Sequence, residues 1–280
     1  MTRIPILLTI ALSTALLPAA THSLTAQLPS LQADPDLVYV RVAAIERTRN
    51  AAVRGLSKQE FKVFEDNVPQ DIVYFSEDTL PLRMGVLTDV SGTSKDDTIR
   101  AVSSMTKSGA KGDEFILLET GKTPLHDAIL QALDALALRG DQGKLALLVI
   151  TSKKEPAAYP LAMVRERLKA LDVQLYVTAL QTGSDVSSDS DRQVIRELAE
   201  RTGGSAYFPS SSFDQADIFK KIVRQLKNQY LIGYRSSNLA MDGKWRKVKI
   251  TAEYLDKKTG KVSKMDILAR PGYYAPKAVK

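Results

Sequence analysis

The chain has 280 residues, 44% of them hydrophobic and 25% charged, a composition that suits one large globular domain or two modest ones. It contains no cysteine, which excludes disulfides, thiolate zinc sites and cysteine nucleophiles, and its two histidines, His22 and His126, exclude a histidine-rich metal site. The net charge is +7, and the segment from Asp217 to the C-terminus carries 16 Lys and Arg against 5 Asp and Glu. Lysines on strand edges, which oppose aggregation, explain this excess of positive charge better than contacts with phosphate or anionic lipid do. We therefore expect no nucleic-acid partner.

The first 26 residues have the pattern of a secretory signal peptide. Arg3 supplies a positive charge, residues 4–17 form an almost unbroken apolar run, and small residues follow. Cleavage after Ala20 and cleavage after Ala26 both fit. The apolar run is shorter than the ~20 residues that a spanning helix needs, which favours a cleaved signal over a membrane anchor. The sequence therefore predicts a secreted or periplasmic protein with no membrane span in the mature chain.

Short strand patterns occur toward both ends of the chain. Residues 36–78 contain three segments rich in β-formers, with polar turns between them. Strand patterns return in residues 229–276, where Asp-Gly and Thr-Gly pairs indicate turns. Because these two regions flank a segment with a different pattern, we predict that their strands pack together as one small β-domain.

Residues 81–228 alternate buried-strand patterns with amphipathic-helix patterns. Strands that alternate with helices indicate βαβ units around a parallel sheet. In open sheets of this kind, ligands bind beyond the carboxyl ends of the strands. The loops at Asp89, Thr123 and Thr151 each follow a strand or open a helix, so we expect them to meet at that edge.

A string of oxygen-bearing side chains, Asp89 to Thr93, follows the first buried strand of this segment. One carboxylate and the hydroxyls of Ser91 and Thr93 are ligands that a hard divalent cation prefers. A simpler interpretation uses no metal. Ser91 and Thr93 would then cap the next helix, and Thr123 would cap a later one with Pro124 in its first position.

Several separate blocks of the chain, in the right order, carry a resemblance to a known family. They are residues 55–61 (GLSKQEF), 64–70 (FEDNVPQ), 89–93 (DVSGT), 123–128 (TPLHDA), 198–204 (LAERTGG), 229–234 (QYLIGY) and 270–274 (RPGYY). With these blocks the chain resembles the von Willebrand factor A (VWFA) superfamily, and more closely the VWFA-related family of exported acidobacterial proteins. The resemblance implies an α/β fold: a Rossmann-like domain with a mostly parallel central sheet flanked by helices, beside the small β-domain.

The resemblance also implies a metal-ion-dependent adhesion site, usually holding Mg²⁺, whose coordination is completed by an acidic group of the partner. Asp89, Ser91 and Thr93 match its first loop, and Thr123 matches its second. The third loop departs from the family pattern, because Ser152 and Lys153 stand where Asp-Gly is common. Losing a carboxylate and gaining an ammonium both weaken cation binding, so whether Mg²⁺ or Mn²⁺ binds is left open.

Three candidate functions are compatible with these sequence features. The first is an exported, non-enzymatic adhesion module that binds another protein through an acidic residue at a partly degenerate metal site. The second is a metal-free structural or scaffold protein that binds through its β-domain, with Lys153 in place of the cation. The third is a hydrolase using Asp89 or His126, but no complete catalytic constellation accompanies either residue. We therefore expect no enzymatic activity and no organic cofactor.

Overall fold

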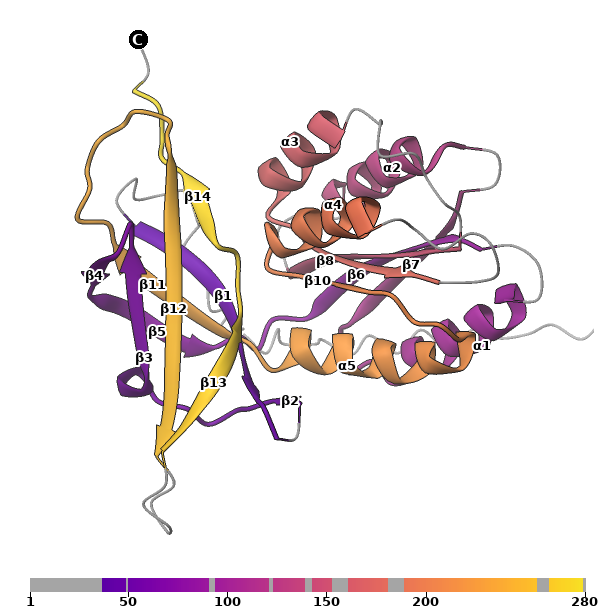
Figure 1. The fold of residues 1–280 in the computed structure, drawn as a ribbon, viewed down its shortest axis with the longest axis horizontal. Helices are drawn as coiled ribbons and strands as arrows, with labels where there is room; N and C mark the ends of the chain where they lie inside the picture. The colour runs from indigo at the N-terminus through magenta and orange to yellow at the C-terminus, as the bar shows by residue number, and fades with distance from the viewer. Residues whose placement is uncertain are drawn as a thin grey trace, which may run out of the picture. The chain divides into compact units, whose positions relative to one another are not determined.

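The computed structural model describes residues 37–278, except residue 49 and segments 91–93, 121–122, 139–142, 153–160, 181–188 and 256–261. The predicted signal peptide, residues 1–26, lies outside the described residues. The strands form two sheets (Figure 1). Among the described residues, no helix combines the length and the apolar character that crossing a bilayer requires.

The larger sheet has nine strands, which come from both ends of the described chain. Its main order is β4-β3-β12-β13-β1-β11-β5, with β14 paired to β12 and β2 paired to β1. All of these pairings are antiparallel. The strands are β1 (Leu37–Glu46), β2 (Ala51–Ala52), β3 (Phe61–Glu65), β4 (Val68–Gln70), β5 (Ile72–Glu77), β11 (Tyr230–Arg235), β12 (Trp245–Leu255), β13 (Val262–Leu268) and β14 (Gly272–Tyr274).

This sheet shows that the predicted fold class is wrong. A Rossmann-like domain with a mostly parallel central sheet would place the main sheet in the middle of the chain, whereas the largest sheet is antiparallel and built from the flanking segments. The physical reason is that long strands are shared between partners. β1 pairs with β11 over residues 37–42 and with β13 over residues 43–46. Local alternation predicts that such a strand exists but not how many partners it has.

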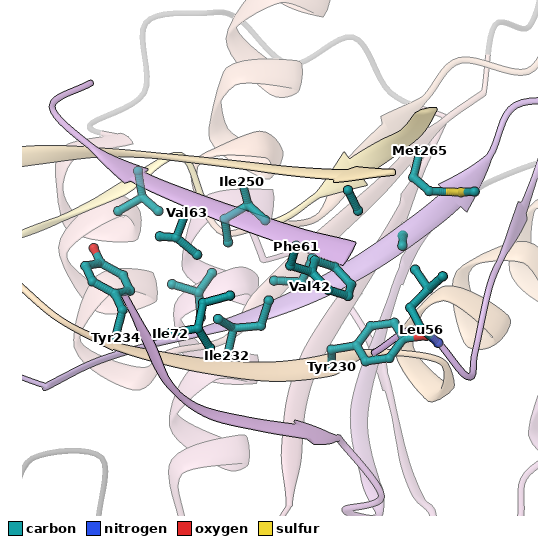
Figure 2. Close-up of a cluster of buried hydrophobic side chains, with 14 of the residues drawn as sticks. Val42, Leu56, Phe61, Val63, Ile72, Tyr230, Ile232, Tyr234, Ile250 and Met265 are labelled. Atoms are coloured by element: carbon teal, nitrogen blue, oxygen red, sulfur yellow. The ribbon is translucent and has the colours of Figure 1, made fainter. Parts of the chain in front are cut away.

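The core of the antiparallel sheet follows from the two-residue period of its strands. In β12, Val248 and Ile250 are buried, whereas Lys247 and Lys249 beside them are exposed. Figure 2 shows the inward side chains of this cluster, which come from strands far apart in the sequence. The ring centroid of Tyr230 lies 5.1 Å from that of Phe61, and its hydroxyl accepts a hydrogen bond of 3.0 Å from the Leu56 amide.

One buried carboxylate is held inside this sheet by hydroxyl groups. The side chain of Glu65 accepts hydrogen bonds from Tyr234 at 2.8 Å, from Tyr273 at 2.9 Å and from Ser236 at 2.6 Å. Burial, together with donation to Glu65, raises the pKa of Tyr234 above its ordinary value. The buried charge is thus paired with donors, as a carboxylate without contact to water requires.

The smaller sheet has five strands in the order β10-β9-β8-β6-β7, and all of its pairings are parallel. Helices α1 and α5 share an apolar core with one face, and α2, α3 and α4 share a core with the other (Figure 1). The strands are β6 (Leu82–Asp89), β7 (Glu114–Glu119), β8 (Lys144–Thr151), β9 (Gln174–Ala179) and β10 (Ser205–Tyr207). The helices are α1 (Ser94–Lys107), α2 (Leu125–Ala137), α3 (Leu161–Leu171), α4 (Asp189–Glu200) and α5 (Gln215–Lys227), with 3₁₀ turns η1 (Lys58–Glu60) and η2 (Ser212–Asp214).

The chain crosses between the two sheets twice, and the crossings run side by side. The amide of Asp78, after β5, donates a 2.8 Å hydrogen bond to the carbonyl of Gln229, before β11. The Asp78 side chain is 1% exposed and accepts a hydrogen bond of 3.0 Å from Arg41. Lys144, at the start of β8, donates to the carbonyl oxygen of Asp78 at 2.9 Å. Burial lowers the pKa of Lys144, and the negative charge of Asp78 opposes that shift.

We predict that Lys144→Ala lowers the free energy of unfolding by ~3–5 kcal/mol, because it leaves the Asp78 carboxylate buried with one cation fewer. Urea unfolding followed by circular dichroism measures the change. Lys220→Ala is the matched control, since Lys220 pairs with Asp217 at an exposed position and should shift the midpoint little. Equal midpoint shifts for the two variants would contradict a special role for the buried lysine.

The carboxylate of Asp113 makes stability depend on pH. Burial tends to raise the pKa of Asp113, but hydrogen bonds from Lys227 and from the amides of Leu82 and Ala110 outweigh it and hold the pKa below its ordinary value. A depressed carboxyl pKa contributes stability above the unfolded pKa of ~3.9, and this stability is lost as the pH falls through the folded pKa.

We therefore expect Asp113→Asn to be less stable than the parent at neutral pH and to lose less stability on acidification below about pH 4. Urea midpoints measured across this range test the expectation. Asp134→Asn, at an exposed pair with Arg167, should keep the parent's pH profile. An unchanged profile for Asp113→Asn would show that other carboxyls determine the acid limb.

Candidate functional site at the carboxyl edge of the parallel sheet

Asp89 is the last residue of β6, a strand with a partner on each side. β6 pairs with β7 and with β8, and Asp89 itself lies opposite Thr151 of β8. The carbonyl of Asp89 accepts a 3.1 Å hydrogen bond from the amide of Ser152. The Asp89 residue is only 4% exposed, although a carboxylate is rarely buried without partners. Its position places a negative charge at the carboxyl edge, where such sheets bind ligands.

Thr120 provides a hydroxyl partner for Asp89, and the sequence analysis missed it. The Thr120 hydroxyl donates to Asp89 Oδ1 at 2.7 Å, and the residue is 5% exposed. The Thr120 amide also donates to the carbonyl of Thr88 at 3.1 Å, which ties the end of β7 to β6. The sequence did contain a signal for Thr120. This residue directly follows the strand β7, and Thr151, at the end of β8, was placed in the expected site for the same reason. Thr120 lies outside the blocks that carry the family resemblance, so the predicted site does not include it.

Thr123 lies near this edge, but its predicted capping role is not what the structure has. α2 begins at Leu125 with Pro124 in the N-cap position, and no side chain caps the helix there. The Thr123 amide instead donates to the carbonyl of Thr120 at 2.9 Å, and its side chain is half-buried. The metal-free explanation of Thr123 as an N-cap is therefore wrong.

The predicted site is described only in part. The structure brings Asp89, Thr120, Thr151 and Ser152 together across β6, β7 and β8. Ser91, Thr93 and Lys153 lie outside the described residues. Among the residues that the structure does describe, no three His, Cys, Asp or Glu side chains gather as a metal site would require. Asp89 is thus the acidic group here, and the other oxygens come from hydroxyl and backbone groups.

The helices that start at this edge carry acidic side chains in their first turns. They are Asp96 and Asp97 in α1, Asp127 in α2, Asp189 and Asp191 in α4, and Asp217 in α5. Negative charge at a helix N-terminus is stabilising through the helix dipole, so these residues have a structural explanation. Two of them also have cationic partners, Asp97 with Arg100 and Asp217 with Lys220, so they do not by themselves make the edge negative.

His126 and Asp127 are in contact, contrary to the expectation that neighbours on a helix point apart. His126 Nε2 lies 3.1 Å from Asp127 Oδ1, in the first turn of α2. A histidine oriented by a carboxylate is half of a catalytic arrangement, but a nucleophile would have to complete it. The His126–Asp127 contact by itself supplies no nucleophile, so it carries no argument for hydrolysis.

No protein-family model matches the sequence, and no curated protein matches it. Among solved structures, the chain is similar to the ArnB paralog VWA2 from Sulfolobus acidocaldarius, with a TM-score of 0.41 and 12% sequence identity. The similarity covers 84% of this chain and 76% of that chain. The neighbour's name includes VWA, and a likeness of this strength shows neither that superfamily nor the narrower family of exported acidobacterial proteins for this chain.

We predict that Thr120→Val destabilises the metal-free protein by ~1–3 kcal/mol, because the buried Asp89 carboxylate loses a hydroxyl donor without regaining water. Thermal or urea unfolding in the presence of a chelator measures the loss. Thr123→Val is the matched control, since the Thr123 side chain is half-buried and should tolerate the change. If Thr120→Val has the same unfolding midpoint as the parent protein, the 2.7 Å hydrogen bond contributes nothing to the stability of the site.

Proposed function

We propose that this protein is a non-enzymatic binding module that presents a divalent cation, Mg²⁺ or Mn²⁺, at the carboxyl edge of its parallel sheet. The observation that carries the proposal is the placement of Asp89, a nearly buried carboxylate at the end of β6, with one oxygen bonded to Thr120. A buried anion at a ligand-binding edge, surrounded by hydroxyl and backbone oxygens, is the chemistry that hard cations prefer.

The residues at the edge fit such an ion by their chemistry. Asp89 supplies the charge, and Ser91, Thr93 and Thr123 are the hydroxyl ligands expected from the sequence. The Thr120 hydroxyl donates to Oδ1 of Asp89 and so helps to fix the orientation of the carboxylate at this edge. When bound, the cation would supply a positive centre whose coordination is completed by a carboxylate of the partner.

Affinity for the cation should be modest. Ser152 stands in the third loop in place of an aspartate, so Asp89 is the single acidic ligand among the candidate residues. Calcium and magnesium affinities follow the number of charged ligands, and one carboxylate predicts weak binding.

The partner and the location belong to the same proposal. A cation held by one carboxylate keeps a positive charge that suits an acidic residue of another protein, so we infer a protein partner. The N-terminal signal pattern supports a secreted or periplasmic protein. Neither inference includes an enzymatic reaction or an organic cofactor.

A metal-free scaffold that binds through its antiparallel sheet is the second candidate. It is favoured by Lys247 and Lys249, which are exposed on β12 and form one face of the strand at two-residue spacing. An acidic partner could pair with these lysines without any cation. The substitution of Ser152 for the usual aspartate supports this candidate equally.

The deciding experiment is a calorimetric titration of Mg²⁺, then Mn²⁺, into chelator-stripped protein. We expect saturable binding in the parent, none in Asp89→Asn, and parent-like binding in Asp127→Asn. The last variant removes a nearby but more exposed carboxylate, so it controls for a general loss of negative charge. Circular dichroism of each variant separates loss of the site from loss of the fold.

Binding in the parent should also raise the melting temperature with increasing Mg²⁺, because a ligand of the folded state stabilises it by mass action. Absence of heat and of stabilisation at millimolar metal would overturn the cation site. Lys247→Glu and Lys249→Glu would then test the second candidate, whose partner binding they should abolish.

A further inference from the structure

In the described part of the chain, six strands of the two sheets pair along one side only, and five of them are protected against pairing with another chain. β2 has two residues, and β4, β10 and β14 have three each, with Pro69 in β4. β5 has a register irregularity where it pairs with β11, between Gly233 and Tyr234. Short length, proline and bulges are the usual means by which proteins block edge-to-edge association.

β7 has none of these protections. It runs for six residues, Glu114–Glu119, without proline or lysine, and its register with β6 is regular throughout. In the described part of the chain it pairs with β6 alone, so its other edge has no strand beside it. Leu117, in its middle, is 60% exposed. A long, regular, aliphatic strand edge of this kind is a template for another strand.

The geometry of α1 and β7 directs a second exposed apolar side chain toward Leu117. Lys95 in the first turn of α1 contacts Glu119 at the end of β7, with Nζ 3.5 Å from Oε2. Ile99 follows Lys95 by one helical turn on the same face, and Leu117 precedes Glu119 by two residues on the same face of the sheet. Because α1 runs back along β7, these steps lead in the same direction. Ile99 is 50% exposed, so an apolar patch adjoins the open edge.

We propose that β7 is a homodimerisation strand, which pairs antiparallel with β7 of a second copy around a two-fold axis at Leu117. An axis perpendicular to the sheet keeps α1 on the same side in both copies. Leu117 then faces its own copy, and Ile116 faces Leu118 of the other chain. The two Ile99 side chains flank this seam. The proposed pairing uses the edge of β7 that faces away from β6, and it does not depend on the proposed cation site.

The charges of β7 favour a second copy over an unrelated strand. In this register each glutamate at the strand ends avoids the glutamates of the other chain, since Glu119 faces Phe115 and Glu114 faces Thr120. Like charges directly opposite one another would destabilise the pair. Glu114 lies 3.7 Å from Arg83, and Glu119 has Lys95, so both carboxylates already have a cation nearby. The strand is therefore complementary to itself.

Cysteine cross-linking tests the pairing and its register, because the parent chain contains no cysteine. Residues opposite each other in an antiparallel pair have Cα atoms ~4.5–5.5 Å apart, within the range that a disulfide spans. Leu117→Cys should therefore oxidise rapidly to a covalent dimer. Glu119→Cys should not, because the two copies of residue 119 would lie about four residues apart along the strands, or ~13 Å.

Two further variants complete the test. Leu138 is 87% exposed, so Leu138→Cys reports disulfides that form by random collision of two molecules. It should cross-link far more slowly than Leu117→Cys. In sedimentation velocity the parent should have the mass of a dimer at micromolar concentrations, and Leu117→Lys should have that of a monomer. Val73→Lys, on the protected edge strand β5 and 52% exposed, should remain a dimer.

The opposite outcomes are equally clear. A monomeric parent across the micromolar range, or Leu117→Cys that cross-links no faster than Leu138→Cys, would overturn the proposal. So would open-ended oligomers, which a two-fold pairing cannot form. Efficient cross-linking of Glu119→Cys alongside Leu117→Cys would overturn the register centred on Leu117.

Discussion

The buried carboxylate of Asp78 is the constraint on which the arrangement of this chain depends. A charge that is 1% exposed must be paired, and its partners come from separate elements. Arg41 of β1 binds the carboxylate at 3.0 Å, and the ammonium of Lys144 in β8 lies 4.0 Å from it while donating to the Asp78 backbone carbonyl. Breaking a buried ion pair leaves an uncompensated charge, so separating either partner from Asp78 would be strongly destabilising. The antiparallel sheet and the parallel sheet are thereby joined through polar contacts of fixed geometry rather than through apolar contact alone. Arg41 also reaches Asp172, and Arg270 binds the same carboxylate, which extends the junction.

The same logic applies at the other end of the parallel sheet. There Asp89 is also nearly buried, but its described side-chain partner is a neutral hydroxyl, that of Thr120. A hydroxyl satisfies a hydrogen-bonding position of a carboxylate without supplying an opposite charge. The two aspartates thus differ in their described partners. Asp78 is paired with cations and joins elements, whereas Asp89 is bonded to a hydroxyl at the edge where we propose a cation site.

Much of the local structure could be predicted from the sequence, because hydrophobic period is a local property. The alternation in β12 and the amphipathic pattern of α2 both correspond to observed elements. The fold class could not be predicted in this way, since strands such as β1 change partners along their length and short strands such as β14 carry little pattern. The buried Lys144 was equally out of reach, because lysine is almost always exposed and only tertiary context reveals the exception. Thr120 was missed because its importance comes from a neighbouring strand, 31 positions away in sequence.

The pairing of the end of β5 with the start of β11 determines where the α/β segment enters and leaves the antiparallel sheet. Glu77, the last residue of β5, lies directly opposite Tyr230, the first of β11, in an antiparallel pair. A tight turn between these residues would join the two strands as an ordinary hairpin. The α/β segment therefore occupies the place of a hairpin loop, and its removal would leave the antiparallel sheet with every strand still in order. The two ends of the α/β segment therefore lie next to each other, which is the geometry that insertion of one domain into another requires.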